Sequence, residues 1–309
     1  MKPPKKKSKT KPKSPSKNPA PQPGNVTVGD YEVGWAGVGY TARAGDHGVA
    51  VAGLDGVAGV PPKSFANAGD YGFAITADEG EARVGLYGVA VAGKNGTAGG
   101  GTGVFATVGD YGAASTGAGG VARVVGYGGR ASTDEGVAYC EHDGTASATG
   151  AGAALVESGS ATAGNGGIAS VRLTGAATAG EGGVARTGNK GDARAGKYGV
   201  AIAGDNSRAE AGNWGVARLT DGGSVFAGTL GVACCLKNGD VRVAQSGVAI
   251  SFEGGTAVAG EGGVIVMGYK DATGRIILKT GHMKPDGRLT PGTFYRLNAK
   301  HRFEAVKKP

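Results

Sequence analysis

The chain of 309 residues has few large side chains and no long apolar run. Seven Phe and two Trp are too few to fill the thick core of an ordinary globular domain of this length. No segment approaches the roughly 18 apolar residues that a membrane span requires. The N-terminal residues also lack the apolar stretch of a secretory signal. These absences argue against a thick-cored globular fold and against a transmembrane helix.

Cysteine is scarce as well. Cys140, Cys234 and Cys235 are the only three, and an odd number with an adjacent pair is no disulfide framework. Together with the missing signal, this scarcity predicts a reducing, cytoplasmic location.

Acidic residues are absent from residues 1–24, which contain eight Lys and are rich in Pro and Ser. This composition predicts a disordered basic tail. The whole chain has a formal net charge of +8, so residues 25–309 sum to zero and the basic pI is ascribed to the tail. The tail is either a solubilising leader or a contact for an anionic polymer or surface, through counterion release. The candidate contact residues are Lys5, Lys6, Lys7, Lys9, Lys11 and Lys13.

Glycine is abundant, and it marks an eight-residue repeat, Gly-x-x-Gly-Val-Ala-x-Ala, from Gly29 to about Arg275. The repeat has 31 consecutive units, of which one, 157–163, is short by a residue. A fixed period over this length indicates a repeat architecture. Gly-x-x-Gly predicts a tight corner, where Gly tolerates a positive φ, and Val-Ala-x-Ala predicts a short strand.

Successive side chains on a strand point to opposite faces, so positions five and seven of the octad share one face. Charged residues gather at these two positions, whereas position six carries one charge, Arg130, and position eight carries none before the last unit. We therefore expect positions six and eight to face an interior lined by alanine. Cys140 and Cys235, at position eight, are interpreted as small apolar fillers.

Position five alternates between two kinds of octad. From residue 53 onward, every second octad carries a mostly β-branched residue there, beginning with Val57 and Phe73, and the octads between carry small or polar residues. Opposite charges also lie sixteen apart, as in Asp192 and Arg208. Corner aromatics show the same spacing in the pairs Tyr71 and Tyr87, Tyr111 and Tyr127, and Tyr198 and Trp214.

A coil of two octads explains these spacings. We predict an all-β fold, a flattened two-sheet parallel β-solenoid of about 15 coils, on the order of 70 Å long at about 4.8 Å per coil. The predicted parts are the tail (1–24), the solenoid (29–267) and a small antiparallel β unit (268–309). The last part contains three strand-like runs separated by turns, and we expect it to cap the open strand edge.

The β-branched row faces outward and is the candidate contact face. It is interpreted either as β-propensity alone or as an apolar stripe that binds a second copy or a protein partner. Its residues are Val89, Val121, Val137, Val184, Val200, Val216, Val232 and Val248.

Catalytic, cofactor and metal sites are not predicted. Cys140-Glu-His-Asp143 is interpreted as an inward Cys followed by a polar corner. His282 and His301 occur without further ligands at metal spacing. The corner aspartates lack the nonapeptide spacing of calcium-binding repeats and are interpreted as solvated turn residues. They are Asp46, Asp70, Asp78, Asp110 and Asp134.

Segments such as GEGGVARTG (180–188) and EGGTAVAGEGG (253–263) carry a family resemblance over roughly 29–275. The repeat resembles the octad-built solenoids of bacterial ice-nucleation proteins, whose 16-residue coils also pair two octads. It is still more similar to uncharacterised bacterial and phage octad-repeat proteins with a short β tail. Ice nucleators present outward Thr-x-Thr ladders, whereas no octad here has Thr at both five and seven. Outward Thr occurs singly, at Thr41, Thr97, Thr107, Thr145, Thr162, Thr178 and Thr256.

The leading expectation is a non-enzymatic rod that acts as a structural or interaction scaffold, with the Val row as contact face and the Lys tail as tether. The first alternative is a protein whose surface orders water or ice. The second is a phage or bacterial effector whose C-terminal unit carries the activity.

Overall fold

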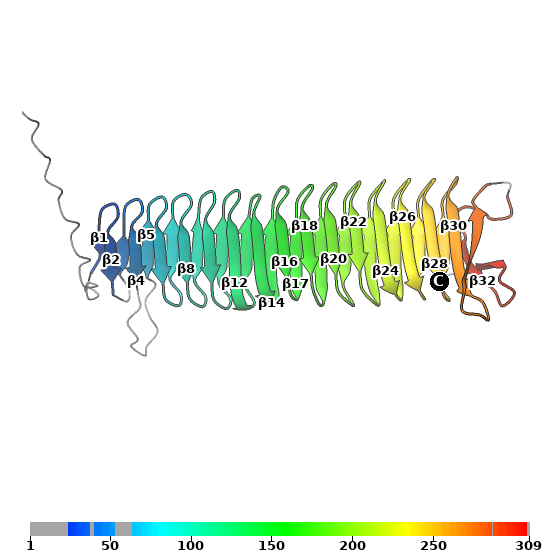
Figure 1. Ribbon diagram of the computed structural model, residues 1–309, viewed down its shortest axis with the longest axis horizontal. Coiled ribbons are helices and arrows are strands. Elements are labelled where there is room, and N and C mark those ends of the chain that lie inside the picture. The colour runs from blue at the N-terminus through cyan, green and yellow to red at the C-terminus, as the bar shows by residue number, and fades with distance from the viewer. Residues whose placement is uncertain (1–23, 38–39, 53–63, 286, 308–309) are drawn as a thin grey trace, which may run out of the picture.

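The computed structural model describes residues 24–37, 40–52, 64–285 and 287–307. The tail lysines and Val57 therefore lie outside the described residues. All regular structure in the described part is β, from β1 to β33. Two sheets lie back to back in a long, flattened solenoid (Figure 1). The all-β, two-sheet prediction is confirmed.

Strands β1 to β30 alternate between the two sheets, here called sheet A and sheet B. The solenoid makes about 14 turns, close to the predicted 15. Sheet A comprises β2 (Val33–Ala36), β4 (Val49–Ala52), β6 (Phe73–Thr76), β8 (Val89–Ala92), β10 (Phe105–Val108), β12 (Val121–Tyr127), β14 (Val137–His142), β16 (Ala153–Val156), β18 (Ile168–Val171), β20 (Val184–Thr187), β22 (Val200–Ala203), β24 (Val216–Asp221), β26 (Val232–Lys237), β28 (Val248–Phe252), β30 (Val264–Lys270) and β31 (Ile276–His282).

Sheet B contains the strands between these, with two more at its C-terminal end. They are β1 (Val26–Thr27), β3 (Thr41–Arg43), β5 (Phe65–Ala68), β7 (Glu81–Val84), β9 (Thr97–Gly100), β11 (Ala113–Thr116), β13 (Arg130–Thr133), β15 (Gly144–Ala148), β17 (Gly159–Ala163), β19 (Gly175–Ala179), β21 (Asp192–Ala195), β23 (Ser207–Ala211), β25 (Gly223–Ala227), β27 (Asp240–Val243), β29 (Thr256–Ala259), β32 (Phe294–Leu297) and β33 (Phe303–Val306).

The strand register confirms the sixteen-residue coil over most of the rod. Asp192 pairs with Arg208, and Arg194 with Glu210, across β21 and β23. The Arg194 guanidinium lies 3.1 Å from the Glu210 carboxylate, so oppositely charged residues do stack between coils.

Four coils depart from the regular length of sixteen residues. Thr41 pairs with Phe65, so that coil is longer than the others by a whole octad. For the same reason Phe73 pairs with Val49, which lies 24 residues before it rather than the expected sixteen. The coil that leads into β13 is one residue too long, and the coil that follows β13 is one residue too short. The short unit 157–163 removes one residue from the next coil, as the sequence predicted.

Arg130 does not face inward as expected. An extra residue between Val124 and Gly129 shifts the register of β12. Arg130 therefore takes the outward position beside Ala113, and Ala131 takes the buried one. One fewer residue at the next corner restores the frame, which is why the octad pattern hides both changes.

The same insertion alters the Tyr111 and Tyr127 pair. The Tyr111 N–H donates to the Tyr127 carbonyl at 2.7 Å, so the two residues do lie on adjacent coils, but the Tyr127 ring does not occupy the place above the Tyr111 ring. Gly128 instead lies over the Tyr111 ring, where an added Cβ would come within 2.5 Å of it. The Tyr127 ring lies beside His142, with 4.9 Å between centroids. The other two predicted pairs do stack, at 5.5 Å for Tyr71 and Tyr87 and 6.5 Å for Tyr198 and Trp214.

The interior is lined by small side chains, as predicted. Position-six alanines such as Ala90 and Ala185 are inaccessible to solvent. Cys140 and Cys235 are free, buried thiols at position eight. Because these side chains are short, the two sheets approach closely and still exclude water.

The template glycines are needed for a reason that the sequence did not predict. The positive φ at regular corners falls mainly on the third residue, as in Tyr71 (56°) and Trp214 (59°). The fourth residue is Gly because neighbouring coils lie too close for a side chain. A Cβ on Gly152 would lie 2.6 Å from the carbonyl oxygen of Gly136 in the adjacent coil.

Corner aspartates form a ladder between coils rather than being merely solvated. The Oδ1 atom of Asp70 accepts a hydrogen bond from the Leu86 N–H at 2.7 Å, and Asp46, Asp78 and Asp110 bond the next coil in the same way. Asp134 instead accepts from the Thr149 hydroxyl. Further along the rod the ladder acceptors are Asn165, Asn189 and Asn213.

Antiparallel strands end the solenoid, as predicted. β31 runs antiparallel to β30 from Ile276 to His282. β32 pairs with β29 through Tyr295 and continues into β33. Figure 1 shows these strands at the C-terminal end of the rod, where they cover the last parallel strand of each sheet.

Candidate functional site

The predicted Val row lies in one column on the outer face of sheet A, and Phe105, Ala153 and Ile168 occupy the strands between its members. Val184, Val200, Val216 and Val232 are direct neighbours on successive strands. Each shields the next, so most are half-buried, while Val137 and Val216 are 36% and 41% exposed. Whether the row binds anything stays a prediction.

A second apolar column runs beside the first at position seven, and sequence analysis missed it. Trp35, Val51, Ile75 and Val91 occupy successive strands in register. Examining position seven separately in alternate octads would have revealed the column. Its apolar members are Trp35, Val51, Ile75, Val91, Tyr139, Leu155, Ile202, Cys234, Ile250 and Val266. Residues that interrupt it are Thr107, Arg123, Ser170, Arg186 and Arg218.

The face widens near the C-terminal end. Strands β24, β26, β28 and β30 extend past the four-residue length, and a groove of about 450 Å³ lies along their ends. Leu236, Phe252, Tyr269 and Ile276 form its apolar lining, with charged residues around them. Gly268 has no side chain, and a Cβ added there would collide with the Phe252 ring that lines the groove.

The outer face of sheet B is polar. Asp192, Arg194, Arg208 and Glu210 form one cluster of ion pairs on it. A column of hydroxyl-bearing residues precedes this cluster, in register on β11 to β19. The column consists of Ser115, Ser132, Ser147, Thr162 and Thr178.

The Cys140-Glu-His-Asp143 segment does not form a nucleophilic site. The Cys140 side chain is fully buried, and its Sγ lies 3.2 Å from the carbonyl oxygen of Thr145. Burial raises the pKa of this thiol to about 11, so it stays protonated at neutral pH, and the thiolate is the nucleophilic form. Glu141 and His142 lie at the outer corner, away from it.

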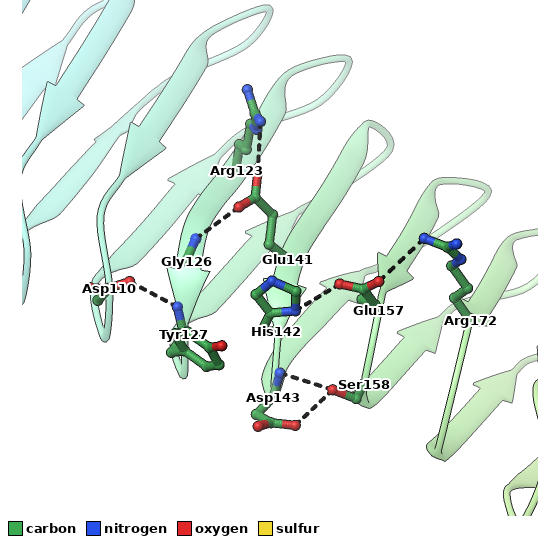
Figure 2. A network of polar contacts seen from close by, with 10 residues as sticks. All are labelled: Asp110, Arg123, Gly126, Tyr127, Glu141, His142, Asp143, Glu157, Ser158 and Arg172. Carbon is green, nitrogen blue, oxygen red and sulfur yellow. Dashed lines mark hydrogen bonds and ion pairs between the residues drawn. The ribbon is translucent and has the colours of Figure 1, made fainter.

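Those outer residues join a polar network that links successive coils (Figure 2). Glu141 accepts hydrogen bonds from Arg123 and from the Gly126 N–H. His142 Nδ1 lies 2.7 Å from Glu157, which also pairs with Arg172 at 3.2 Å. The network lies where a coil that is too long meets one that is too short, and its contacts connect these irregular coils.

Metal sites are absent from the described part of the chain: no group of three or more His, Cys, Asp or Glu side chains lies close enough to hold an ion. No helix of the length and apolarity that a membrane span requires occurs there either.

Charge is divided among the parts of the chain more sharply than the net value indicates. Residues 25–267 contain 15 Lys and Arg and 22 Asp and Glu, whereas residues 268–309 contain ten and three. The body without its tail is therefore not uniformly neutral, because an acidic rod ends in a basic cap. Comparison with protein-family models and with curated proteins gave no match for this chain.

Proposed function

We propose that the protein is a non-enzymatic rod that self-associates through the outer face of sheet A and serves as a structural scaffold. The observation that supports this is the pair of apolar columns, which follow sheet A and have no counterpart on sheet B. Exposed apolar patches of this extent are characteristic of contact surfaces.

The size of the face suits a stable interface. Fourteen steps of about 4.8 Å and strands of four residues at about 3.3 Å each give on the order of 900 Å². Two such faces would bury about 1,800 Å², which falls in the standard range for specific complexes.

A second copy of the chain is the occupant that fits best. Both copies would present columns with the same repeat spacing, so the side chains of one face can fit between those of the other. A two-fold axis makes such a contact closed and self-complementary. The Lys-rich tail would then tether the assembled rods to an anionic polymer or surface.

Sedimentation of a double variant, Val200→Lys/Val216→Lys, tests the proposal. We expect the parent to sediment as a dimer or larger species and the variant to dissociate at least about 100-fold more readily, because burying unpaired ammonium groups is costly. Thr162→Lys/Thr178→Lys is the matched control, since it adds the same charge to adjacent strands of sheet B. A monomeric parent, or a variant that sediments like the parent, would refute self-association through this face.

A surface that orders water or ice is the second candidate, and the hydroxyl column on sheet B favours it. Its five members stand at the regular spacing of the coils, and Thr145 and Ser160 lie beside two of them. A droplet-freezing assay tests this function. An unchanged freezing temperature would refute this function. If the protein does raise the freezing temperature, Thr162→Val/Thr178→Val should reduce that effect.

We also propose that this chain is related to the octad-built solenoids of bacteria and phages. This relation is supported by the sixteen-residue coil, which the strand register reproduces.

A further inference from the structure

The C-terminal cap differs from the rod in charge. Its ten Lys and Arg against three Asp and Glu contrast with the acidic excess of residues 25–267. The field of the rod repels an anionic ligand, whereas the field of the cap attracts it.

A cavity of about 760 Å³ lies in this cap, and its volume is in the range of small-molecule sites. All four ionisable side chains among its described lining residues are bases, and no carboxylate is among them. They are His282, Arg288, His301 and Arg302. Leu289 and Phe303 supply apolar walls. We refer to it as the cap cavity.

Two arginines of the cap cavity have no ion-pair partner among the described residues. They are Arg288 and Arg302, and both are exposed. Elsewhere in the cap, Arg296 pairs with Glu304 at 3.2 Å. A guanidinium keeps its charge and offers a fork of N–H donors that matches a phosphate group.

The turn that carries two of these bases is fixed by Asn298. Its Oδ1 accepts hydrogen bonds from the N–H groups of Lys300 and Arg302, at 2.9 and 3.1 Å. Its own N–H donates to the Arg302 carbonyl, and its carbonyl accepts from the His301 N–H. The His301 ring stacks on Tyr269 with 3.6 Å between centroids. A turn held in this way has less freedom to lose when a ligand binds.

We propose that the cap cavity binds a nucleoside phosphate, either a free nucleotide or the phosphorylated end of a nucleic-acid strand. Arg288 and Arg302 hold the phosphate, and the two imidazoles add ring N–H donors. A phosphate alone would fill a small part of the volume. The remaining space and the walls formed by Leu289 and Phe303 suit an attached base.

Fluorescence anisotropy tests this site in the full-length protein, with the six candidate tail lysines replaced by Gln to remove their contribution. The probe is a 5′-phosphorylated single-stranded DNA of about 12 nucleotides. AMP and inorganic phosphate are competitors. Arg288→Ala/Arg302→Ala should weaken binding at least about tenfold. The matched control, Arg275→Ala/Lys279→Ala, removes the same charge from the cap outside the cavity, and binding should change less than about threefold.

The competitors identify the source of the phosphate. Displacement of the probe by AMP supports a free nucleotide, and binding of the phosphorylated strand without AMP competition supports a strand end. The proposal is overturned if both double variants lose affinity equally, if an unphosphorylated strand binds as well, or if no phosphate-bearing probe binds. Arginine-dependent binding to anionic phospholipid vesicles without nucleotide binding would also overturn it. These outcomes are separate from sedimentation, which tests the sheet A face.

Discussion

The outer faces of sheets A and B enclose the same interior, but they carry different kinds of side chain. Inside, both sheets carry alanine and other small residues, which the closeness of the sheets requires. Outside, sheet A carries the two apolar columns, which Arg123, Arg186 and Arg218 interrupt. Sheet B carries mainly hydroxyl, charged and small residues, with Phe65 and Phe226 as exposed exceptions. Stacking of the coils needs neither set, because the same backbone ladder supports both faces.

This difference weakens the view that the Val row reflects strand propensity alone. Preference for branched residues on a pleated surface acts on both sheets alike, yet the apolar column at position five follows sheet A through nearly every described coil. A selective pressure on sheet A, such as burial against another molecule, explains the asymmetry. Substitutions at interior positions should therefore act alike in either sheet, and substitutions at outer positions should not.

The largest effect is expected where coils touch. An added Cβ at Gly136 would overlap the carbonyl oxygen of Gly120, so Gly136→Ala should cost about 3 kcal/mol or more in unfolding free energy. Gly182 has open space but a φ of 67°, so Gly182→Ala should cost only about 1 kcal/mol. Denaturant titrations of both variants measure the difference, and equal losses would contradict the steric explanation.

Next in size is a single charge placed on one face or the other. Val232→Asp, on sheet A, should weaken self-association by about tenfold or more, because the carboxylate would be buried without a partner. Ser224→Asp adds the same charge to sheet B and should leave association unchanged. Sedimentation at a series of concentrations makes the comparison, and similar dissociation constants for the two variants would remove the asymmetry between faces.

A smaller effect is expected from two stacked interior threonines of sheet B. Thr116 and Thr133 are both buried neighbours, but the Thr133 hydroxyl donates to the Gly117 carbonyl at 3.2 Å, whereas the Thr116 hydroxyl has no partner among the described residues. Thr116→Val should stabilise the rod by about 1 kcal/mol, and Thr133→Val should destabilise it by a similar amount. Unfolding free energies of the same sign for both variants would show that the hydroxyls do not differ.

The smallest effect concerns acid. A hydrogen bond from the Tyr127 N–H, and then the Lys94 side chain, lowers the pKa of Asp110. The stabilisation from this group is therefore present above the ordinary carboxyl pKa and is lost as the pH falls through the lowered value, below about pH 4. Asp110→Asn keeps the ladder acceptor, so its melting temperature should fall less on acidification, by about 1–2 °C.

The reverse substitution, from Asn to Asp, can be made at Asn165. Its Oδ1 accepts the Glu181 N–H at 2.9 Å without titrating. Asn165→Asp should therefore add acid sensitivity to the later part of the rod. Melting curves recorded from pH 2 to 7 compare the variants with the parent. Parallel curves for all three proteins would show that the ladder does not carry the acid response.

How much could be predicted depended on whether a feature repeats. The alternation at position five predicted the coil, and the pairs Asp192 with Arg208 and Tyr71 with Tyr87 followed from it. The enlarged coil before Phe73 and the displaced Arg130 were missed. In the second case, an insertion and a compensating deletion leave the octad pattern unchanged. The second apolar column shows in the sequence only when position seven is compared between alternate octads.

The cap cavity could not have been predicted in the same way. His282, Arg288, His301 and Arg302 belong to segments without a repeat, and no spacing relates them. They come together because β31 and β33 fold back onto the end of the rod.

The sequence by itself determined the two-octad coil, the small interior and the separation of an apolar from a polar set of strands. These features are periodic, and each coil meets the same neighbours as the one before it. The tertiary structure alone decided why the template glycines are required, how the corner Asp and Asn residues link the coils, and which cap residues line one cavity. Those features depend on distances between coils and between distant strands, and such distances are set when the chain packs against itself.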